Sequence, residues 1–152
     1  MKKLLTIFLA IAVSVVFAVW QLNRLAADTS LSQWQVGAGG YRLALQQQVE
    51  NKKPVLMFFH TDWCQACKEL ESNVLGQKSI IEYLKKFNTV QIDPEKNQPN
   101  HDLADQYSVY GYPTLLLIHN GTRTAIRLPI GGKSSVEKFI KVCNLALRKE
   151  NT

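Results

Sequence analysis

Cysteine is scarce in this chain, and its scarcity limits the chemistry open to it. The 152 residues contain three cysteines, which is too few for a disulfide scaffold. Cys64 and Cys67 form a C-x-x-C pair, and no second such pair supplies the further ligands that a zinc site needs. Lys68 follows the pair where haem attachment requires histidine. We therefore expect no metal and no bound cofactor at these cysteines.

The chain also has little net charge and no repeated segments. The formal net charge is +6, and because Lys2 and Lys3 lie at the N-terminus, the rest of the chain carries about +4. The basic residues are scattered, with no arginine-rich stripe and no interleaved aromatic residues, so we expect no nucleic-acid binding. There are no internal repeats. The length and the 46% hydrophobic content fit one globular domain with one added apolar segment.

That added segment is the uncharged run over residues 4–20, which follows two lysines. Residues 1–20 are therefore predicted to be a signal peptide or an N-terminal membrane anchor. An anchor is favoured by Trp20, which suits a membrane interface, although 17 residues is the lower limit for a spanning helix. Cleavage after Ala18 is the alternative. Either way, the following domain is expected in the periplasm, anchored to the inner membrane or soluble.

The remaining chain alternates between helical and strand patterns. A polar stretch over 21–40 predicts a linker, and 41–150 is expected to form one domain. The apolar run over 55–59 is typical of a strand buried on both faces. Periodicity predicts helices and further strands at these positions: helices at 41–49, 66–75, 79–87, 101–107 and 134–148, and strands at 89–92, 114–118 and 122–128.

Two local motifs mark where the last elements begin. Asn120-Gly121 predicts a hairpin turn between two strands. Ser134 and Glu137 have the spacing of a capping box, which predicts the start of the last helix. The order of the elements predicts an α/β fold in which helices cover both faces of a mixed central sheet of about four to five strands.

The C-x-x-C pair lies directly after the buried strand and at the head of a helical segment. At a helix N-terminus, unpaired backbone N–H groups and the helix dipole favour a thiolate over a thiol. The thiolate is the species that attacks disulfides. The two intervening residues let the sulfur of Cys67 reach that of Cys64, so the pair can switch between dithiol and disulfide.

Three stretches after residue 40 resemble the thioredoxin superfamily. VLMFFHTDWCQACKELE resembles its active-site strand and helix, YSVYGYPTLLLIHNG resembles its second half, and LPIGG resembles its end. Within the superfamily, TDWCQACKELE is most similar to the C-terminal periplasmic domain of the membrane electron conductor DsbD and to related membrane-anchored proteins. The resemblance implies a thioredoxin fold and a thiol–disulfide oxidoreductase.

The resemblance also implies roles for individual residues. Cys64 would be the nucleophile that attacks a substrate disulfide, and Cys67 would resolve the mixed disulfide. Pro113 would follow a cis peptide bond, which would expose the backbone of Tyr112 to a substrate strand. Trp63 would pack beside the sulfurs and shield them.

The chain departs from the thioredoxin pattern in two places. Phe58 lies six positions before the first cysteine, where thioredoxins carry a buried acid that accepts the proton of the second cysteine. Glu71 lies four residues after Cys67 on the same helix face and could replace that acid, or it could be a solvated surface glutamate. Gln65-Ala66 replaces the Gly-Pro found between the cysteines of ordinary thioredoxins.

Three further residues near these motifs have competing interpretations. His60 could modulate the thiolate, but a packed or hydrogen-bonded histidine is favoured. Lys68 could favour the thiolate electrostatically or be solvated. Cys143 lies on the apolar stripe of the last helix and is expected to be buried and inert.

Together these patterns predict a periplasmic thiol–disulfide oxidoreductase, with reduction favoured over oxidation. Its expected partners are protein disulfide substrates and a membrane electron conductor of the DsbD type. Two alternatives stay open: a disulfide oxidase or isomerase, and a non-catalytic thioredoxin-fold binding or assembly module.

Overall fold

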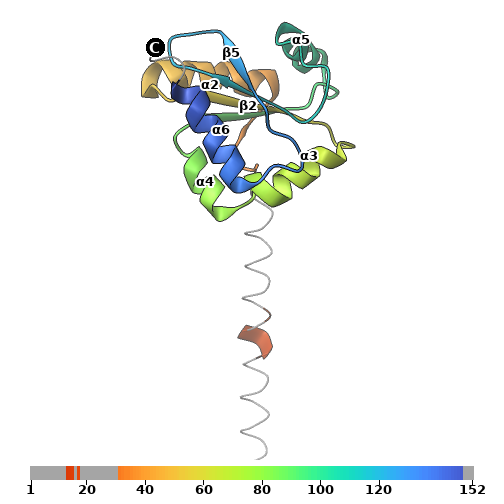
Figure 1. The fold of residues 1–152 in the computed structure, drawn as a ribbon. Helices are drawn as coiled ribbons and strands as arrows, with labels where there is room; N and C mark the ends of the chain where they lie inside the picture. The colour runs from red at the N-terminus through yellow and green to blue at the C-terminus, as the bar shows by residue number, and fades with distance from the viewer. Residues whose placement is uncertain (1–12, 16, 18–30, 149–152) are drawn as a thin grey trace, which may run out of the picture.

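The computed structural model describes residues 13–15, 17 and 31–148, and its core is a five-stranded mixed sheet (Figure 1). The strand order is β1-β3-β2-β4-β5. The first three strands of this order are parallel, and β4 and β5 are antiparallel to their neighbours. The strand bounds are β1 Gln35–Val36, β2 Val55–Phe59, β3 Asn88–Ile92, β4 Thr114–Ile118 and β5 Ala125–Leu128. The predicted mixed sheet of four to five strands is confirmed.

Helices cover both faces of this sheet, as predicted (Figure 1). Their bounds are α2 Gly37–Asn51, α3 Gln65–Leu70, η1 Glu71–Leu75, α4 Lys78–Leu84, α5 Gln98–Gln106 and α6 Val136–Arg148. Side chains alternate between the two faces of a strand. Leu56 and Phe58 of β2 therefore join the core beneath α3, η1, α4 and α6, while Met57 and Phe59 join the core beneath α2 and α5. All five residues of β2 are buried, which confirms the expected central strand.

The part of the expected linker that the structure describes belongs to the fold. Gln35–Val36 pair with β3, Trp34 is 5% exposed, and helix α2 begins at Gly37 rather than at residue 41. Gly37 opens the helix with φ of 65°, a conformation that glycine adopts at little steric cost. The glycines that indicated a loop are thus the first turn of a helix.

The other elements differ from their predicted bounds in detail. The active-site helix changes at Glu71 from an α-helix to one π-helical turn, η1. Helix α5 starts at Gln98, three residues early, because the Asn97 side chain accepts a hydrogen bond from the N–H of Asn100. The hairpin at Asn120-Gly121 is confirmed: β4 and β5 pair antiparallel, and Gly121 has φ of 83°.

Helix α6 is capped differently from the predicted capping box. Ser135, not Ser134, accepts a hydrogen bond from the N–H of Lys138 (3.2 Å). Ser134 instead accepts from the N–H of Gly131 (3.1 Å), so its side chain closes the preceding turn. The apolar stripe of this helix is confirmed, with Phe139 and Cys143 fully buried.

Most of the predicted signal peptide or anchor lies outside the described residues. Of the segment 4–20, the structure describes residues 13–15 and 17, which are helical and exposed. Within the described residues, no helix combines the length and the apolar character needed to cross a bilayer.

Phe139 should contribute far more to stability than an apolar residue six positions later on the same helix. Phe139 is fully buried, whereas Leu145 is 51% exposed. We expect Phe139→Ala to lower the free energy of unfolding by about 3–5 kcal/mol, and Leu145→Ala to change it by less than about 0.5 kcal/mol. Urea unfolding of the oxidised protein measures both. Equal losses would show that α6 does not cover the sheet.

Candidate active site

The site is built around the turn between β2 and α3. Cys64 is the N-cap residue of α3, with an extended backbone, and its sulfur accepts a hydrogen bond from the N–H of Cys67 (3.1 Å). Its carbonyl also accepts from the N–H groups of Cys67 and Lys68 (3.1 and 3.2 Å). The predicted placement of the first cysteine at a helix N-terminus is confirmed, and the first N–H groups of this helix point at its sulfur and carbonyl.

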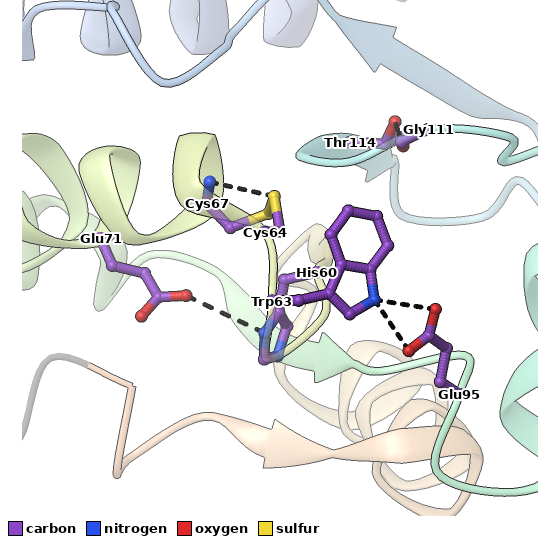
Figure 2. Close-up of a disulfide and its surroundings, with 8 residues drawn as sticks. All are labelled: His60, Trp63, Cys64, Cys67, Glu71, Glu95, Gly111 and Thr114. Carbon is purple, nitrogen blue, oxygen red and sulfur yellow. Dashed lines mark hydrogen bonds and ion pairs between the residues drawn. A yellow bond between two sulfur atoms is a disulfide. The ribbon is translucent and has the colours of Figure 1, made fainter.

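The two cysteines form a disulfide. Their Cα atoms are 5.2 Å apart, which lies within the usual range for such a bond. Cys64 is 4% exposed and Cys67 is fully buried, so Cys64 is the more accessible of the two residues. Figure 2 shows the disulfide at the start of α3, with Gly111 and Thr114 across from it.

Gly111 lies in the loop before β4, which holds the predicted proline, and Thr114 is the first residue of β4. The peptide bond between Tyr112 and Pro113 is cis, as the family resemblance implied. Thr114 donates a hydrogen bond through its hydroxyl to the carbonyl of Gly111 (2.8 Å). Arg127 of β5 holds both ends of this loop in place. It donates hydrogen bonds to the Thr114 hydroxyl and to the carbonyl of Ser108 (2.9 Å each). The sequence analysis did not identify Arg127, because its partners come together only through the β4–β5 pairing.

Trp63 lies on the surface beside the disulfide rather than over a closed site. Its side chain is 66% exposed, and its indole N–H donates to both carboxylate oxygens of Glu95 (3.0 and 2.9 Å; Figure 2). Its ring meets that of Tyr112 edge to face, with 6.2 Å between centroids. The expected packing beside the active site is present, and Glu95, which the sequence analysis missed, orients the indole.

Gly132 is a third site residue that the sequence analysis missed. A Cβ atom at this position would lie 2.7 Å from the carbonyl oxygen of Ala66 and 3.0 Å from its Cα. The loop before α6 therefore packs directly on the backbone of the active-site helix. Only a glycine fits this approach without moving one of the two segments.

Glu71 and His60 lie together beneath the disulfide (Figure 2). The Glu71 carboxylate is turned toward the imidazole, with Oε1 3.9 Å from Nδ1 of His60. Burial raises the pKa of Glu71, although nearby Lys68 opposes the shift. Burial also lowers the pKa of His60, against the opposing charges of Asp93 and Asp62. Glu71 is thus a half-buried group and not a fully solvated surface glutamate.

The outer wall of the site is charged. Lys96 forms ion pairs with Asp62 and with Asp93 (3.7 Å to the latter). A hydrogen bond from Lys96 holds the pKa of the Asp62 carboxyl below its usual range. Lys68 is exposed on α3. Among the described residues, no group of three histidine, cysteine, aspartate or glutamate side chains is arranged to hold a metal ion.

Cys143 takes no part in this site. It is fully buried on α6, and burial raises the pKa of its thiol to about 12. A thiol with such a pKa is almost wholly protonated at neutral pH and is a poor nucleophile. The structure agrees with the expectation that Cys143 is buried; its inertness stays a prediction.

Fold and site together define a thioredoxin-fold protein whose C-x-x-C pair closes a disulfide at a helix N-terminus. A family model described as thioredoxin-like matches residues 38–119, more than half of the chain. The chain therefore belongs to the thioredoxin-like family.

The chain is similar to two kinds of named protein. It is 32% identical over 91 residues to the thiol:disulfide interchange protein DsbD of Neisseria meningitidis, which covers 59% of this chain and 15% of that protein. It is 29% identical over 119 residues to the disulfide bond reductase DsbH of Chlamydia pneumoniae. This match covers 70% of this chain and 69% of that protein. The chain thus spans less than a fifth of the length of these DsbD relatives. For the Campylobacter jejuni protein, the matched share of its length is 17%.

Solved structures show the same fold. A structure of a DsbH oxidoreductase matches with a TM-score of 0.59 and 28% identity, over 74% of this chain and 85% of that one. The oxidised C-terminal domain of N. meningitidis DsbD matches with a TM-score of 0.60 and 22% identity, over 74% and 97%. The predicted resemblance and the thioredoxin fold are confirmed.

Replacing Gly132 should disturb the active-site helix, whereas its neighbour should tolerate the same change. Gly132→Ala places a methyl group against backbone atoms of Ala66, while a Cβ at Gly131 meets nothing within 4 Å. We expect Gly132→Ala to lower the free energy of unfolding by about 1–3 kcal/mol, and Gly131→Ala to change it by less than about 0.5 kcal/mol. Denaturant unfolding of the oxidised protein measures both values. Similar values for the two variants would contradict the close contact.

Proposed function

We propose that this protein is a periplasmic thiol–disulfide reductase that passes electrons through the Cys64/Cys67 pair to protein disulfides. The observation that carries the proposal is the closed disulfide at the N-terminus of α3, with the sulfur of Cys64 as N-cap acceptor. The same N–H groups would stabilise a thiolate on Cys64 once the bond is reduced. The pair needs no bound metal or cofactor for this chemistry.

The proposed reaction is a two-electron exchange in two steps. The Cys64 thiolate attacks one sulfur of a substrate disulfide, forming a mixed disulfide and releasing the other sulfur as a thiolate. The Cys67 thiol then gives up its proton, for which Glu71 is the proposed acceptor, and attacks the sulfur of Cys64. The second substrate sulfur leaves as a thiolate that takes a proton from water. The substrate gains two electrons and the Cys64–Cys67 disulfide is restored.

A substrate would approach over the aromatic edge of the site. Trp63 is 66% exposed and Tyr110, in the loop before Pro113, is 84% exposed. Tyr112 packs against Trp63 at the same edge. We propose that an extended substrate segment contacts Trp63, Tyr112 and Pro113 while its disulfide reaches Cys64.

Two features support the reducing direction and the periplasmic location. The named relatives include a disulfide bond reductase and several thiol:disulfide interchange proteins called DsbD. The segment 4–20, preceded by two lysines, has the pattern of an export signal or an anchor. A reductase outside the cytoplasm requires electrons from across the membrane, so a membrane electron conductor of the DsbD type is the proposed donor.

Removing the proposed nucleophile should abolish activity without unfolding the chain. Serine can keep the N-cap hydrogen bond that the sulfur of Cys64 accepts from the N–H of Cys67. We expect Cys64→Ser to lose at least about 1000-fold in dithiothreitol-driven insulin reduction, since the covalent step is lost. Cys143→Ala, which removes the buried thiol of α6, should keep wild-type activity. Equal rates for Cys64→Ser and wild type would overturn the enzyme proposal in favour of a binding or assembly module.

The redox potential of the pair separates reductase from oxidase. A reductase needs a potential near that of thioredoxin, about −270 mV, whereas a strong oxidase such as DsbA lies near about −120 mV. We expect a value below about −200 mV. Equilibration with glutathione or dithiothreitol buffers, followed by alkylation of free thiols, measures it. A value near the oxidase end would reverse the proposed direction while keeping the site.

A further inference from the structure

His60 is held rigidly beneath the disulfide. It follows β2 directly, and its backbone N–H donates to the carbonyl of Ile92 (3.0 Å). Its ring stacks on that of Phe58, two residues earlier on the same face, with 5.0 Å between centroids and 12° between planes. The side chain is only 16% exposed. In this orientation Nδ1 of the ring points toward Glu71.

Glu71 faces His60 from the helix that carries the cysteines. Their 3.9 Å separation is longer than a hydrogen bond, so the two groups are neighbours that a small side-chain rotation would join. Glu71 lies one helical turn after Cys67, on the same side of the helix. Figure 2 shows both groups below the disulfide. Glu71 thus lies on the side of the helix that carries Cys67, and His60 lies next to Glu71.

The other side of His60 opens to water. A cavity of about 560 Å³ lies beside it, and His60, Asp62, Asp93 and Lys96 are among its lining residues. Gln91 of β3 also lines this cavity. His60 thus separates the half-buried Glu71 from a charged, solvent-filled space, and it can exchange a proton with either.

We propose that His60 is a positioning residue that holds the Glu71 carboxylate beneath the disulfide and returns to solvent the proton that Cys67 releases. This inference rests on the proposed function, because it concerns the step in which Cys67 attacks the mixed disulfide. The proton passes from the Cys67 sulfur to a Glu71 oxygen, then to His60 Nδ1, and leaves through the cavity. No redox partner beyond the substrate disulfide is required.

The arrangement gives the resolving step a defined pH dependence. The groups that face His60 are Glu71 from the active-site helix, Asp62 from the turn, and Asp93, Lys96 and Gln91 from β3 and its following loop. Burial moves the pKa of Glu71 up and that of His60 down, so the two groups become closer in proton affinity. Above the pKa of His60 the imidazole is neutral and can accept a proton. Below it the imidazole is already protonated, so resolution slows as the pH falls.

Reaction of the reduced protein with Ellman's reagent, an aromatic disulfide, tests this step directly. Attack by Cys64 releases one coloured thiolate, and resolution by Cys67 releases a second, so stopped-flow absorbance separates the two. We expect His60→Phe, which keeps the stacking on Phe58, to slow the second phase about tenfold at pH 7 and to remove its low-pH inflection. The first phase should be unchanged. Glu71→Gln should act similarly, and the double variant should lose no more than either single one.

His101→Phe is the matched control. His101 pairs with Asp105 on α5 at 3.4 Å and is exposed, so it is a histidine–carboxylate pair outside the site. Both phases of this variant should match wild type at every pH. A His60→Phe variant whose second phase follows wild type, or losses that multiply in the double variant, would overturn the inference and leave the proposed function standing. A wild-type protein that releases no coloured thiolate would overturn both.

Titration of the wild-type histidines by NMR tests the pair even if a variant fails to fold. In the dithiol form the Cys64 thiolate adds a negative charge near His60, so its titration midpoint should be higher than in the disulfide form. Identical His60 midpoints in the two forms would show that His60 does not sense the cysteine pair, and the inference would fail.

Discussion

The structure depends on one turn, the five residues that join the central strand to the active-site helix. Its first constraint is that β2 is buried on both faces, so the end of the strand cannot shift. Its second is that Cys64 serves as the helix cap through both its sulfur and its carbonyl, while its own N–H donates to the carbonyl of Thr61 (3.1 Å). An N-cap side chain that satisfies a helix N–H is favoured by about 1 kcal/mol. The interaction that fixes the start of the helix is therefore also the one that would stabilise a thiolate.

Three contacts between distant segments then surround that sulfur. Gly132 packs against the backbone of Ala66 and leaves no room for a side chain behind the helix. Arg127 fastens the loop that contains the cis proline, and Glu95 holds Trp63 at the rim. Each contact joins segments that are far apart in the sequence, and each leaves the disulfide between a fixed helix and a fixed loop. The three contacts thus set the surroundings of the disulfide.

The difference between local and long-range contacts explains which elements and site residues could be predicted from the sequence. The buried strand 55–59, the helix start at Cys64 and the hairpin at Asn120-Gly121 depend on neighbouring residues, and they were predicted correctly. The contacts made by Glu95, Arg127 and Gly132 join segments that are distant in the sequence. No local pattern therefore identifies these residues. The buried face of helix α2 is hidden for another reason: two of its apolar residues, Leu43 and Val49, are 48% and 68% exposed. Ala38, Ala44 and Gln48 are the buried residues instead. The two alanines let the helix pack closely on the sheet, and the Gln48 amide donates to the carbonyl of Ile118 (3.1 Å).

The position of Phe58 connects the core to the chemistry. A fully buried carboxylate there would carry a large desolvation cost, whereas an aromatic ring packs without one. Phe58 is fully buried and stacks on His60, so the titratable groups move outward to the boundary between the core and the charged cavity. At that boundary Glu71 and His60 keep part of their hydration, and each retains a route to water. The chain therefore places Glu71 and His60 beside the core rather than within it, and burial shifts the pKa of each.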